Sequence, residues 1–367
     1  MCGSTRRGRG WAPREYTAEV LSGSSFSVRP LAHTEFAREA ELVHTAYAAG
    51  PYAEELARDA AWAAAERDSA GRAAGGAVLV AVASDAADGG ALLGAVTVVR
   101  GGSAYAKLAA PGEVELRFLA VSPDARGEGI GAALIRAGVE LALCWGVDLV
   151  RLDTGVKNPA AGLYERLGFV RTPELDAKLD GLSYGSSLSY AYPLQERVDV
   201  RLREIRTAEI PEVSELVLAA YRDDYEGLPA TYLGEIANVA ERAAQHRVWV
   251  AEDTESGALL GTITTPRPGQ RLSDVAQPGE MDLRLLGVAR SARGRGIGSL
   301  IMRHGLRLAR IRGTARVVLN TSTEMVAAYQ LYDRMGFERL PEREQRIERP
   351  DGSGFTLLAY GIDAAAS

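Results

Sequence analysis

The sequence predicts an α/β protein made of two tandem copies of one domain, each with a mixed central β-sheet flanked by helices on both faces. One observation is an internal repeat, in which three short segments recur in the same order with a shift of about 167 residues. The other is the same succession of strand-like and helix-like patterns in each half of the chain. A period of this length is far too long for a solenoid, so it indicates a duplicated domain.

The repeat consists of three matches whose order and spacing agree within one residue. The first is Pro-Gly-Glu-Val-Glu-Leu-Arg-Phe-Leu-Ala-Val, which returns as Pro-Gly-Glu-Met-Asp-Leu-Arg-Leu-Leu-Gly-Val. The second is Arg-Gly-x-Gly-Ile-Gly and the third is Leu-Tyr-x-Arg-x-Gly-Phe. The paired segments are 111–121 and 278–288, 126–131 and 293–298, and 163–169 and 331–337. Chance is a poor explanation for such agreement, so we expect both halves to share one fold.

The chain of 367 residues has the length of two ordinary domains. The boundary falls near 193–201, which gives a first domain over 25–195 and a second over 199–363. Residues 1–24 are rich in Gly, Ser and Arg, and we interpret them as a flexible N-terminal extension.

Alternating or continuous apolar runs predict the strands, and Ala- and Glu-rich or 3.6-periodic runs predict the helices. The central helix of the first half, for example, places Leu134, Ala137, Leu141 and Cys144 on one face. In the first half we expect strand 25–31, helices 34–48 and 53–69, strands 77–83, 92–100 and 114–121, helix 129–145, strand 149–152, helix 159–167 and strand 188–192. In the second half we expect strand 200–205, helices 208–222 and 229–243, strands 247–252, 259–265 and 281–288, helix 296–312, strand 315–320, helix 323–335 and strand 356–362.

Composition limits the possible classes of function. The net charge is −6, from 42 basic and 48 acidic residues, which argues against a general nucleic-acid binder because such proteins carry a basic surface. Two cysteines give no disulfide framework, and the four histidines show no metal-ligand spacing, so we expect no metal. No apolar run reaches the roughly 18 residues of a membrane span. We therefore expect a cytoplasmic protein without a membrane or nucleic-acid partner.

A strand, a glycine-rich loop and a helix follow one another in both halves. A helix N-terminus offers unpaired N–H groups and a positive dipole end to a phosphate, and glycines let the backbone approach it closely. Both loops lack the Lys-Ser/Thr of the Walker motif, and Ala132 and Ser299 stand where the dinucleotide fingerprint has its third glycine. The loop also follows a fourth strand instead of opening the domain, which disfavours both kinds of nucleotide site.

These loops, Arg126-x-x-Gly129-x-Gly131 and Arg293-x-x-Gly296-x-Gly298, resemble the acyl-CoA loop of the GNAT superfamily of N-acetyltransferases. Each follows a strand that ends in Leu-Ala-Val or Leu-Gly-Val and precedes a Leu-Tyr-x-x-x-Gly-Phe element, and the resemblance covers nearly all of 25–363. It implies two tandem GNAT-like domains and an enzyme that transfers an acetyl group from acetyl-CoA, or another short acyl-CoA, to an amine by direct attack. The acceptor is then a small-molecule amine or an amine of a peptide or protein.

The resemblance also implies which residues hold the cofactor. The loop amides would bind the CoA pyrophosphate, and the strand before the loop would pair with the pantetheine arm through its backbone, as in β-augmentation. Asn158 would contact the arm as well, although Met325 and Val326 stand at the corresponding place of the second half. The implied residues are Leu119, Ala120, Val121, Arg126, Gly127, Glu128, Gly129, Ile130, Gly131 and Asn158 in the first half, and Leu286, Gly287, Val288, Arg293, Gly294, Arg295, Gly296, Ile297 and Gly298 in the second.

Four residues are implied as catalytic. Glu115 and Asp282, each six residues before the end of its strand, match a general base that removes a proton from the acceptor ammonium, often through water. Tyr164 and Tyr332 match the tyrosine that faces the CoA sulfur, where a phenol can protonate or hydrogen-bond the leaving thiolate. The alternatives are a carboxylate that pairs with a nearby arginine and a tyrosine that only packs against the cofactor.

Several questions stay open at this point. Tyrosines after the first helix of each half either line an acceptor pocket or cover the sheet; these are Tyr47, Tyr52, Tyr221 and Tyr225. His304 and Cys144 are expected to pack in the core. Both halves can be active, one half can be catalytic and the other structural, or the chain can be a non-enzymatic protein that binds or senses acyl-CoA.

Overall fold

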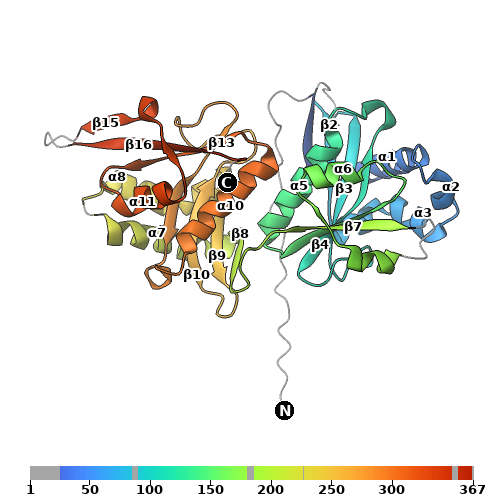
Figure 1. Ribbon diagram of the computed structural model, residues 1–367, viewed down its shortest axis with the longest axis horizontal. Coiled ribbons are helices and arrows are strands. Elements are labelled where there is room, and N and C mark those ends of the chain that lie inside the picture. Colours follow the sequence, from blue (N-terminus) through green and yellow to red (C-terminus); the bar gives the residue numbers. More distant parts are fainter. Residues whose placement is uncertain (1–24, 85–89, 180–185, 226, 349–353, 366–367) are drawn as a thin grey trace, which may run out of the picture.

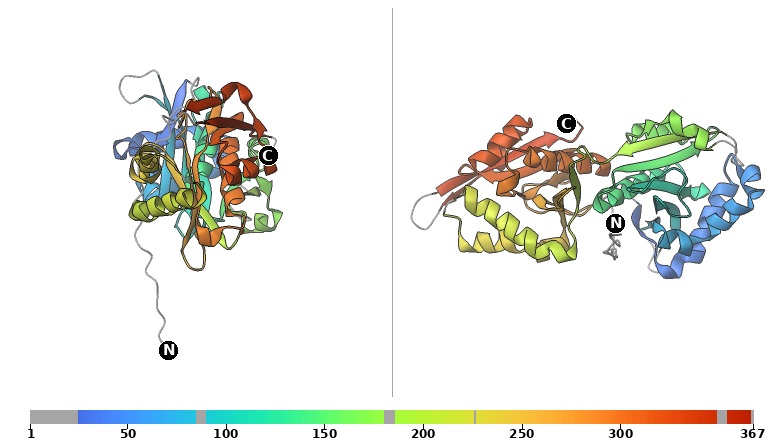
Figure 2. Two further views of the ribbon diagram at one scale, coloured as in Figure 1. Left: turned by 90° about the vertical axis from the view of Figure 1, so that its left-hand side faces the viewer. Right: turned by 90° about the horizontal axis from the view of Figure 1, so that it is seen from below.

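The computed structural model describes residues 25–84, 90–179, 186–225, 227–348 and 354–365; the expected extension 1–24 lies outside these ranges. The two halves lie side by side, with the first half in blue to green and the second in yellow to red (Figures 1 and 2). Both contain a mixed sheet with helices packed on it, as the fold class predicts. No helix in the described ranges is long and apolar enough to cross a membrane.

The first half is built on one seven-stranded sheet in the order β1-β2-β3-β4-β5-β7-β6. Its strands are antiparallel neighbours except for β4 and β5, which are parallel. The elements are β1 (Phe26–Pro30), α1 (Phe36–Ala48), α2 (Ala53–Ala57), α3 (Ala60–Arg67), α4 (Ser69–Ala74), β2 (Gly76–Ala83), β3 (Leu92–Arg100), β4 (Glu113–Val121), α5 (Ile130–Trp145), β5 (Leu149–Gly155), α6 (Ala161–Arg166), β6 (Val170–Arg171) and β7 (Ser187–Pro193).

The second half divides its strands between two sheets, β12-β10-β9-β8 and β11-β13-β16-β14, and β15 pairs with β16. The elements are β8 (Val200–Glu204), α7 (Ile210–Asp224), α8 (Ala230–Ala237), α9 (Val239–Gln245), β9 (Arg247–Asp253), β10 (Leu259–Thr265), β11 (Glu280–Asp282), β12 (Arg284–Val288), α10 (Ile297–Arg312), β13 (Arg316–Ser322), α11 (Val326–Arg334), β14 (Glu338–Arg339), β15 (Gln345–Glu348) and β16 (Gly354–Asp363). The short β14 and β15 were not predicted.

Side chains that alternate along the central strands explain why helices cover both faces. On β2, Val80 and Val82 pack with α1, whereas Leu79 and Ala81 belong to the core that contains α5. The second half follows the same rule, with α7 on one face of its β9–β10 pair and α10 on the other. Helices on both faces of the sheet are what the periodicity of the sequence predicted.

Three elements predicted as continuous are interrupted in the structure. Helix 53–69 is broken at Asp59, whose carboxylate accepts from the N–H groups of Ala61 and Trp62 and so starts a new helix. Helix 229–243 is broken in the same way at Asn238, which caps α9. Strand 281–288 is interrupted at Leu283, and this break separates the two sheets of the second half.

The halves share a buried contact at α5 and α10, which lie next to each other at the middle of the molecule (Figure 1). Glu140 of α5 reaches across the boundary, and its Oε1 lies 3.1 Å from Nε of Arg247 and 2.7 Å from a guanidinium nitrogen of Arg312. All three side chains are buried. One continuous apolar core also includes residues of both halves, so the boundary is closely packed.

Candidate active site

A wedge opens between neighbouring strands in each half. The parallel pairing of β4 with β5 runs from Glu113 to Glu115, and that of β11 with β13 runs from Glu280 to Asp282. Beyond these points the strands diverge, so the later residues of β5 and β13 face an open gap on that side. The gap has polar backbone groups along its edge, which is a suitable place for an extended, amide-containing ligand.

A β-bulge accounts for the divergence, and it recurs at equivalent places in the two halves. Phe118 and Leu285 have φ values of 51° and 55°, which are unfavourable for residues with a side chain. The register shifts by one residue at each of them, between β3 and β4 and between β10 and β12. Strained backbone that is kept in both copies suggests a constraint imposed by the site, because a bulge bends its strand away from the neighbour.

The two glycine loops meet the requirements of an anion site. Gly129 and Gly296 are the N-cap residues of α5 and α10, with φ values of 82° and 75°, and no side chain caps either helix. A Cβ atom at either glycine would meet no atom within 4 Å, so the space above the loop is free. The uncapped N–H groups of the first helical turn are therefore available to a phosphate.

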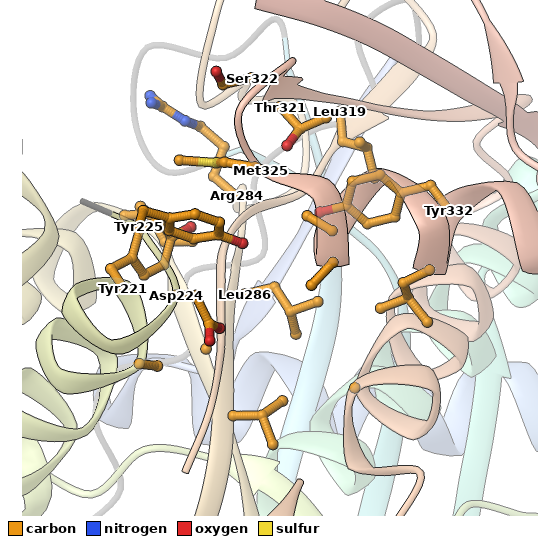
Figure 3. Close-up of a pocket in the computed structure, with 18 of the residues that line it drawn as sticks. Tyr221, Asp224, Tyr225, Arg284, Leu286, Leu319, Thr321, Ser322, Met325 and Tyr332 are labelled. Atoms are coloured by element: carbon orange, nitrogen blue, oxygen red, sulfur yellow. The ribbon is translucent and has the colours of Figure 1, made fainter. Parts of the chain in front are cut away.

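A cavity of about 1010 Å³ joins these features in the second half. Its walls come from β12, from the loop at Gly294–Ser299, from the end of β13 and from α11, and α7 and α8 close the other side (Figure 3). Eight of the nine cofactor residues predicted for the second half lie on this wall, namely Leu286, Gly287, Val288, Arg293, Gly294, Gly296, Ile297 and Gly298. Arg295, by contrast, is not on the cavity wall and pairs with Asp253 at 3.1 Å.

Both predicted acid tyrosines occupy the same place in their halves. Tyr164 and Tyr332 are buried in α6 and α11, each beside the Phe and the Tyr that follow it in the repeat. Burial raises the pKa of both phenols far above the usual value, so they stay protonated at neutral pH. Tyr332 lies on the cavity wall (Figure 3).

The two predicted bases are fully buried and hold loops in place. Oε2 of Glu115 accepts from the N–H groups of Lys107, Leu108 and Ala109, at 2.7 to 3.1 Å, and Oε1 lies 3.6 Å from Nε of Arg117. Burial raises the pKa of Glu115, although Arg117 opposes this.

Asp282 accepts from the N–H of Leu272 at 2.9 Å and from the hydroxyl of Ser273 at 2.8 Å, and it is not on the cavity wall. Its base role stays a prediction, as does that of Glu115, and the contacts add an anchoring role for both.

The side chain of Asn158 bonds the backbone two residues further along the chain. Its Oδ1 accepts from the N–H of Ala160 at 3.1 Å, which supports the turn before α6. Its predicted contact with a pantetheine arm stays a prediction, and Met325 lines the cavity in the second half instead.

Aromatic side chains lie at the corresponding end of the first half. The ring of Tyr52 covers Gly155 at the end of β5, where an added Cβ would meet it at 2.4 Å, and its hydroxyl accepts from the N–H of Lys157 at 2.7 Å. Trp62 packs between Tyr47, which it meets edge to face, and Phe118, with ring centroids 5.1 Å from each. These contacts connect the helices α1–α3 to β4 and β5.

In the second half, by contrast, the related Tyr221, Tyr225 and Tyr232 line the cavity. Of the four tyrosines left open by the sequence, Tyr52 covers Gly155 of the sheet and Tyr47 packs against Trp62, whereas Tyr221 and Tyr225 line the cavity.

Several residues on the cavity wall were missed by the sequence reasoning, and three of them are chemically informative. They are Tyr232, Arg284 and Thr321. Tyr232 could have been found because it is the third residue of α8, as Trp62 is of α3. Thr321 is repeated as Thr154 at the shift of 167 residues, and its buried Oγ1 has no hydrogen-bond partner within the described ranges.

His304 and Cys144 behave as core residues. His304 packs its ring 4.4 Å from that of Trp249, and burial lowers its pKa to about 3, so it stays neutral. Burial raises the pKa of the Cys144 thiol well above its usual value, which makes it unreactive. Neither lies on the cavity wall.

Comparison with known proteins gives the family. A model described as the acetyltransferase (GNAT) family matches residues 39–169 and again 210–337. A mycothiol acetyltransferase of Rhodococcus opacus (strain B4) is 30% identical over 250 residues, 64% of this chain and 75% of that protein. One of Parafrankia sp. (strain EAN1pec) is 30% identical over 265 residues, 66% of this chain and 79% of that protein.

N-acetyltransferase family 8 member 3 of Rattus norvegicus is 33% identical over 143 residues, 39% of this chain and 57% of that protein. A solved GNAT-family acetyltransferase of Staphylococcus aureus covers 45% of this chain and 99% of its own, at 15% identity and a TM-score of 0.35. Because the family model matches both halves and more than half of the chain, the resemblance drawn from the two loops is confirmed, and this protein belongs to the GNAT family of acetyltransferases.

Proposed function

We propose that the chain is an acetyl-CoA-dependent N-acetyltransferase in which the second half carries the transfer to an amine. The main support is the cavity of about 1010 Å³, where the wedge, the glycine loop and Tyr332 meet. At the corresponding end of the first half, Tyr52 covers Gly155 and Trp62 packs on Phe118. The first half then serves as a structural partner, joined to the second through Glu140.

The reaction needs three things from the protein. The acyl-CoA pyrophosphate would be held by the amides at the start of α10, and the arm would extend along the gap between β12 and β13. The amine nitrogen attacks the thioester carbonyl carbon, a C–N bond forms, the C–S bond breaks and the amine loses a proton. A phenol at Tyr332 would donate a hydrogen bond to the sulfur as negative charge develops there.

The raised pKa of Tyr332 favours a hydrogen-bonding role over complete proton transfer. A thiol has a pKa of about 8.5, which is below that of this buried phenol. Transfer of the phenolic proton to the thiolate would therefore be uphill, whereas a hydrogen bond to it stabilises the transition state at no such cost. A carboxylate base at Asp282 would act through water, because Asp282 is not on the cavity wall.

Calorimetric titration of the full chain with acetyl-CoA, CoA and ATP tests the proposal, together with an assay of free-thiol release over a panel of amines. We expect acetyl-CoA to bind, ATP to bind far more weakly, and thiol release to require an amine. Binding of ATP without binding of CoA would contradict the proposal. Binding of acetyl-CoA without amine-dependent thiol release would favour a non-enzymatic acyl-CoA sensor.

Thr321→Val is expected to stabilise the free protein slightly and to weaken acetyl-CoA binding. The hydroxyl of Thr321 points into the cavity (Figure 3) and has no hydrogen-bond partner within the described ranges, so its burial costs free energy until a ligand bonds it. We expect a Tm higher by about 1–3 °C and an acetyl-CoA Kd higher by about fivefold. Thermal unfolding and calorimetry measure the two effects.

Two variants control this experiment. Thr321→Ser keeps the hydroxyl and should bind acetyl-CoA almost normally. Thr262→Val removes a buried hydroxyl that already donates to the carbonyl of Trp249 at 2.9 Å, so it should lower Tm and leave the Kd unchanged. If Thr321→Val lowered Tm in the same way and left the Kd unchanged, the hydroxyl would have no ligand role.

A further inference from the structure

Two arginines related by the repeat, Arg117 and Arg284, stand directly before the bulge residues of β4 and β12. Arg117 is enclosed within the first half, where its side chain is 8% exposed. Its guanidinium pairs with Glu115 on the same strand, donates to the carbonyl of Tyr105 and lies 4.8 Å from the ring centre of Phe118. Its charge is therefore matched within the fold.

Arg284 is in a different situation. Its side chain is 27% exposed and lies on the cavity wall, on the side of Met325 (Figure 3). The carboxylate two residues before it is Asp282, which is one methylene shorter than Glu115. Like Glu115 it bonds the loop before its own strand, but within the described ranges it makes no ion pair with the arginine. The ion pair that Arg284 does make is with Glu235 at 3.5 Å, and the side chain of Glu235 is 54% exposed.

The other charges around the cavity do not neutralise this guanidinium. Asp224 is paired with Arg293 at 2.7 Å, at the phosphate end. Glu324, Arg334 and Glu348 are exposed to solvent, where salt screens their fields. A half-exposed ion pair such as that with Glu235 contributes little stability and can be exchanged for another partner at small cost.

From these contacts we propose that Arg284 binds an acidic group of the acceptor, so that the acceptor is a small amine that also carries a carboxylate. This rests on the proposed function, because it concerns the same cavity. A guanidinium binds a carboxylate through two parallel N–H···O bonds, and this geometry favours it over the weaker contact with Glu235. The apolar cavity residues Met325, Phe355 and Leu357 would hold a hydrocarbon or aromatic body between the two polar groups.

Calorimetry with a matched pair of probes tests the proposal without requiring turnover. The probes are 3-phenylpropionate and its neutral amide, 3-phenylpropionamide, titrated into the full chain in the presence of CoA. We expect the acid to bind about tenfold more tightly than the amide, because a hydrogen bond between charged groups contributes about that much more affinity than one to a neutral group. Arg284→Gln should remove this difference and leave binding of the amide unchanged. Arg271→Gln, an exposed arginine outside the cavity, should preserve it.

Glu235→Gln is an independent test, in which we expect the affinity for the acid to rise and not to fall. Removal of the competing carboxylate should strengthen binding of the acid by a few-fold, even if Arg284→Gln proved unstable. The proposal is overturned if wild type binds acid and amide equally, or if Glu235→Gln weakens binding of the acid. Tight binding of 2-phenylethylamine that depends on Glu235 would also overturn it, in favour of a cationic site. Normal acetyl-CoA binding and thiol release alongside any of these results would leave the proposed function intact.

Discussion

Replacement of Tyr332 by Phe is expected to lower kcat for amine-dependent thiol release by about 100-fold, whereas Tyr164→Phe should change it less than about twofold. A positioned hydrogen-bond donor aimed at developing negative charge commonly contributes a factor of about 10²–10³ to such a step. Tyr332 is protonated, as a hydrogen-bond donor must be, because burial raises the pKa of its phenol. It also lies on the wall of the cavity, where we propose that it reaches the bound thioester.

The change to Phe isolates the hydroxyl. The rings of Phe337 and Tyr360 lie 5.9 and 5.7 Å from that of Tyr332, and a Phe ring keeps both contacts. We therefore expect Tm and the calorimetric Kd of acetyl-CoA to stay close to the wild-type values. A loss confined to kcat would then separate a role in the transition state from a role in cofactor packing.

Tyr164→Phe is the matched control, because the repeat places the two tyrosines in the same structural position. Equal losses in both variants would mean that both halves turn over and would contradict the assignment of activity to the second half. If neither variant slowed thiol release, the role of the tyrosine hydroxyl would be refuted.

The repeat and its loops were predictable because they depend on local chemistry. Positive φ values at Gly129 and Gly296 favour glycine for local steric reasons, so the loop leaves a trace in the sequence. Alternation along the strands likewise predicts two covered faces. The prediction of one helix over 53–69 was wrong for a local reason that the sequence shows. Asp disfavours the interior of a helix and favours its N-cap, and Asp59 therefore starts a new helix.

The difference between the halves could not be read from the motifs. Glu115 and Asp282 occupy the same place in the repeat and both bond the loop before their strand, but Glu115 also pairs with Arg117. Arg284 pairs instead with the exposed Glu235 and lies on the cavity wall. Trp62 and Tyr232 occupy the same place in their helices, but Trp62 packs on Phe118. Whether a site is open depends on such tertiary contacts, which short motifs do not encode.

Glu140→Ala is expected to destabilise the whole chain by about 3–5 kcal/mol, the range observed when one member of a buried ion pair is removed. Glu140 bonds both Arg247 and Arg312, and all three are buried at the contact between the halves. The variant leaves two guanidiniums facing a cavity in the core. Arg247 keeps its bond to Glu204, and Arg312 keeps those to the Pro266 carbonyl and the Met281 sulfur. Urea unfolding followed by tryptophan fluorescence and by circular dichroism measures the loss.

The same group makes the contact sensitive to acid. Burial alone would raise the pKa of Glu140, but the guanidiniums of Arg312 and Arg247 outweigh it and hold the pKa below the usual range. A lowered pKa in the folded state means that this stabilisation is complete above the unfolded value of about 4.3 and is lost as pH falls through the folded one. The Glu140→Ala variant should therefore lose less stability than wild type on acidification.

Glu54→Ala is the control, because its pair with Arg58 is exposed and Tm should hardly change. Because α5 and α10 share one core, we expect Glu140→Ala to shift unfolding of both halves together. Two separate transitions, with only one of them shifted, would show that the halves are energetically independent. In that case the first half could not serve as the structural partner that the cavity of the second half is proposed to need.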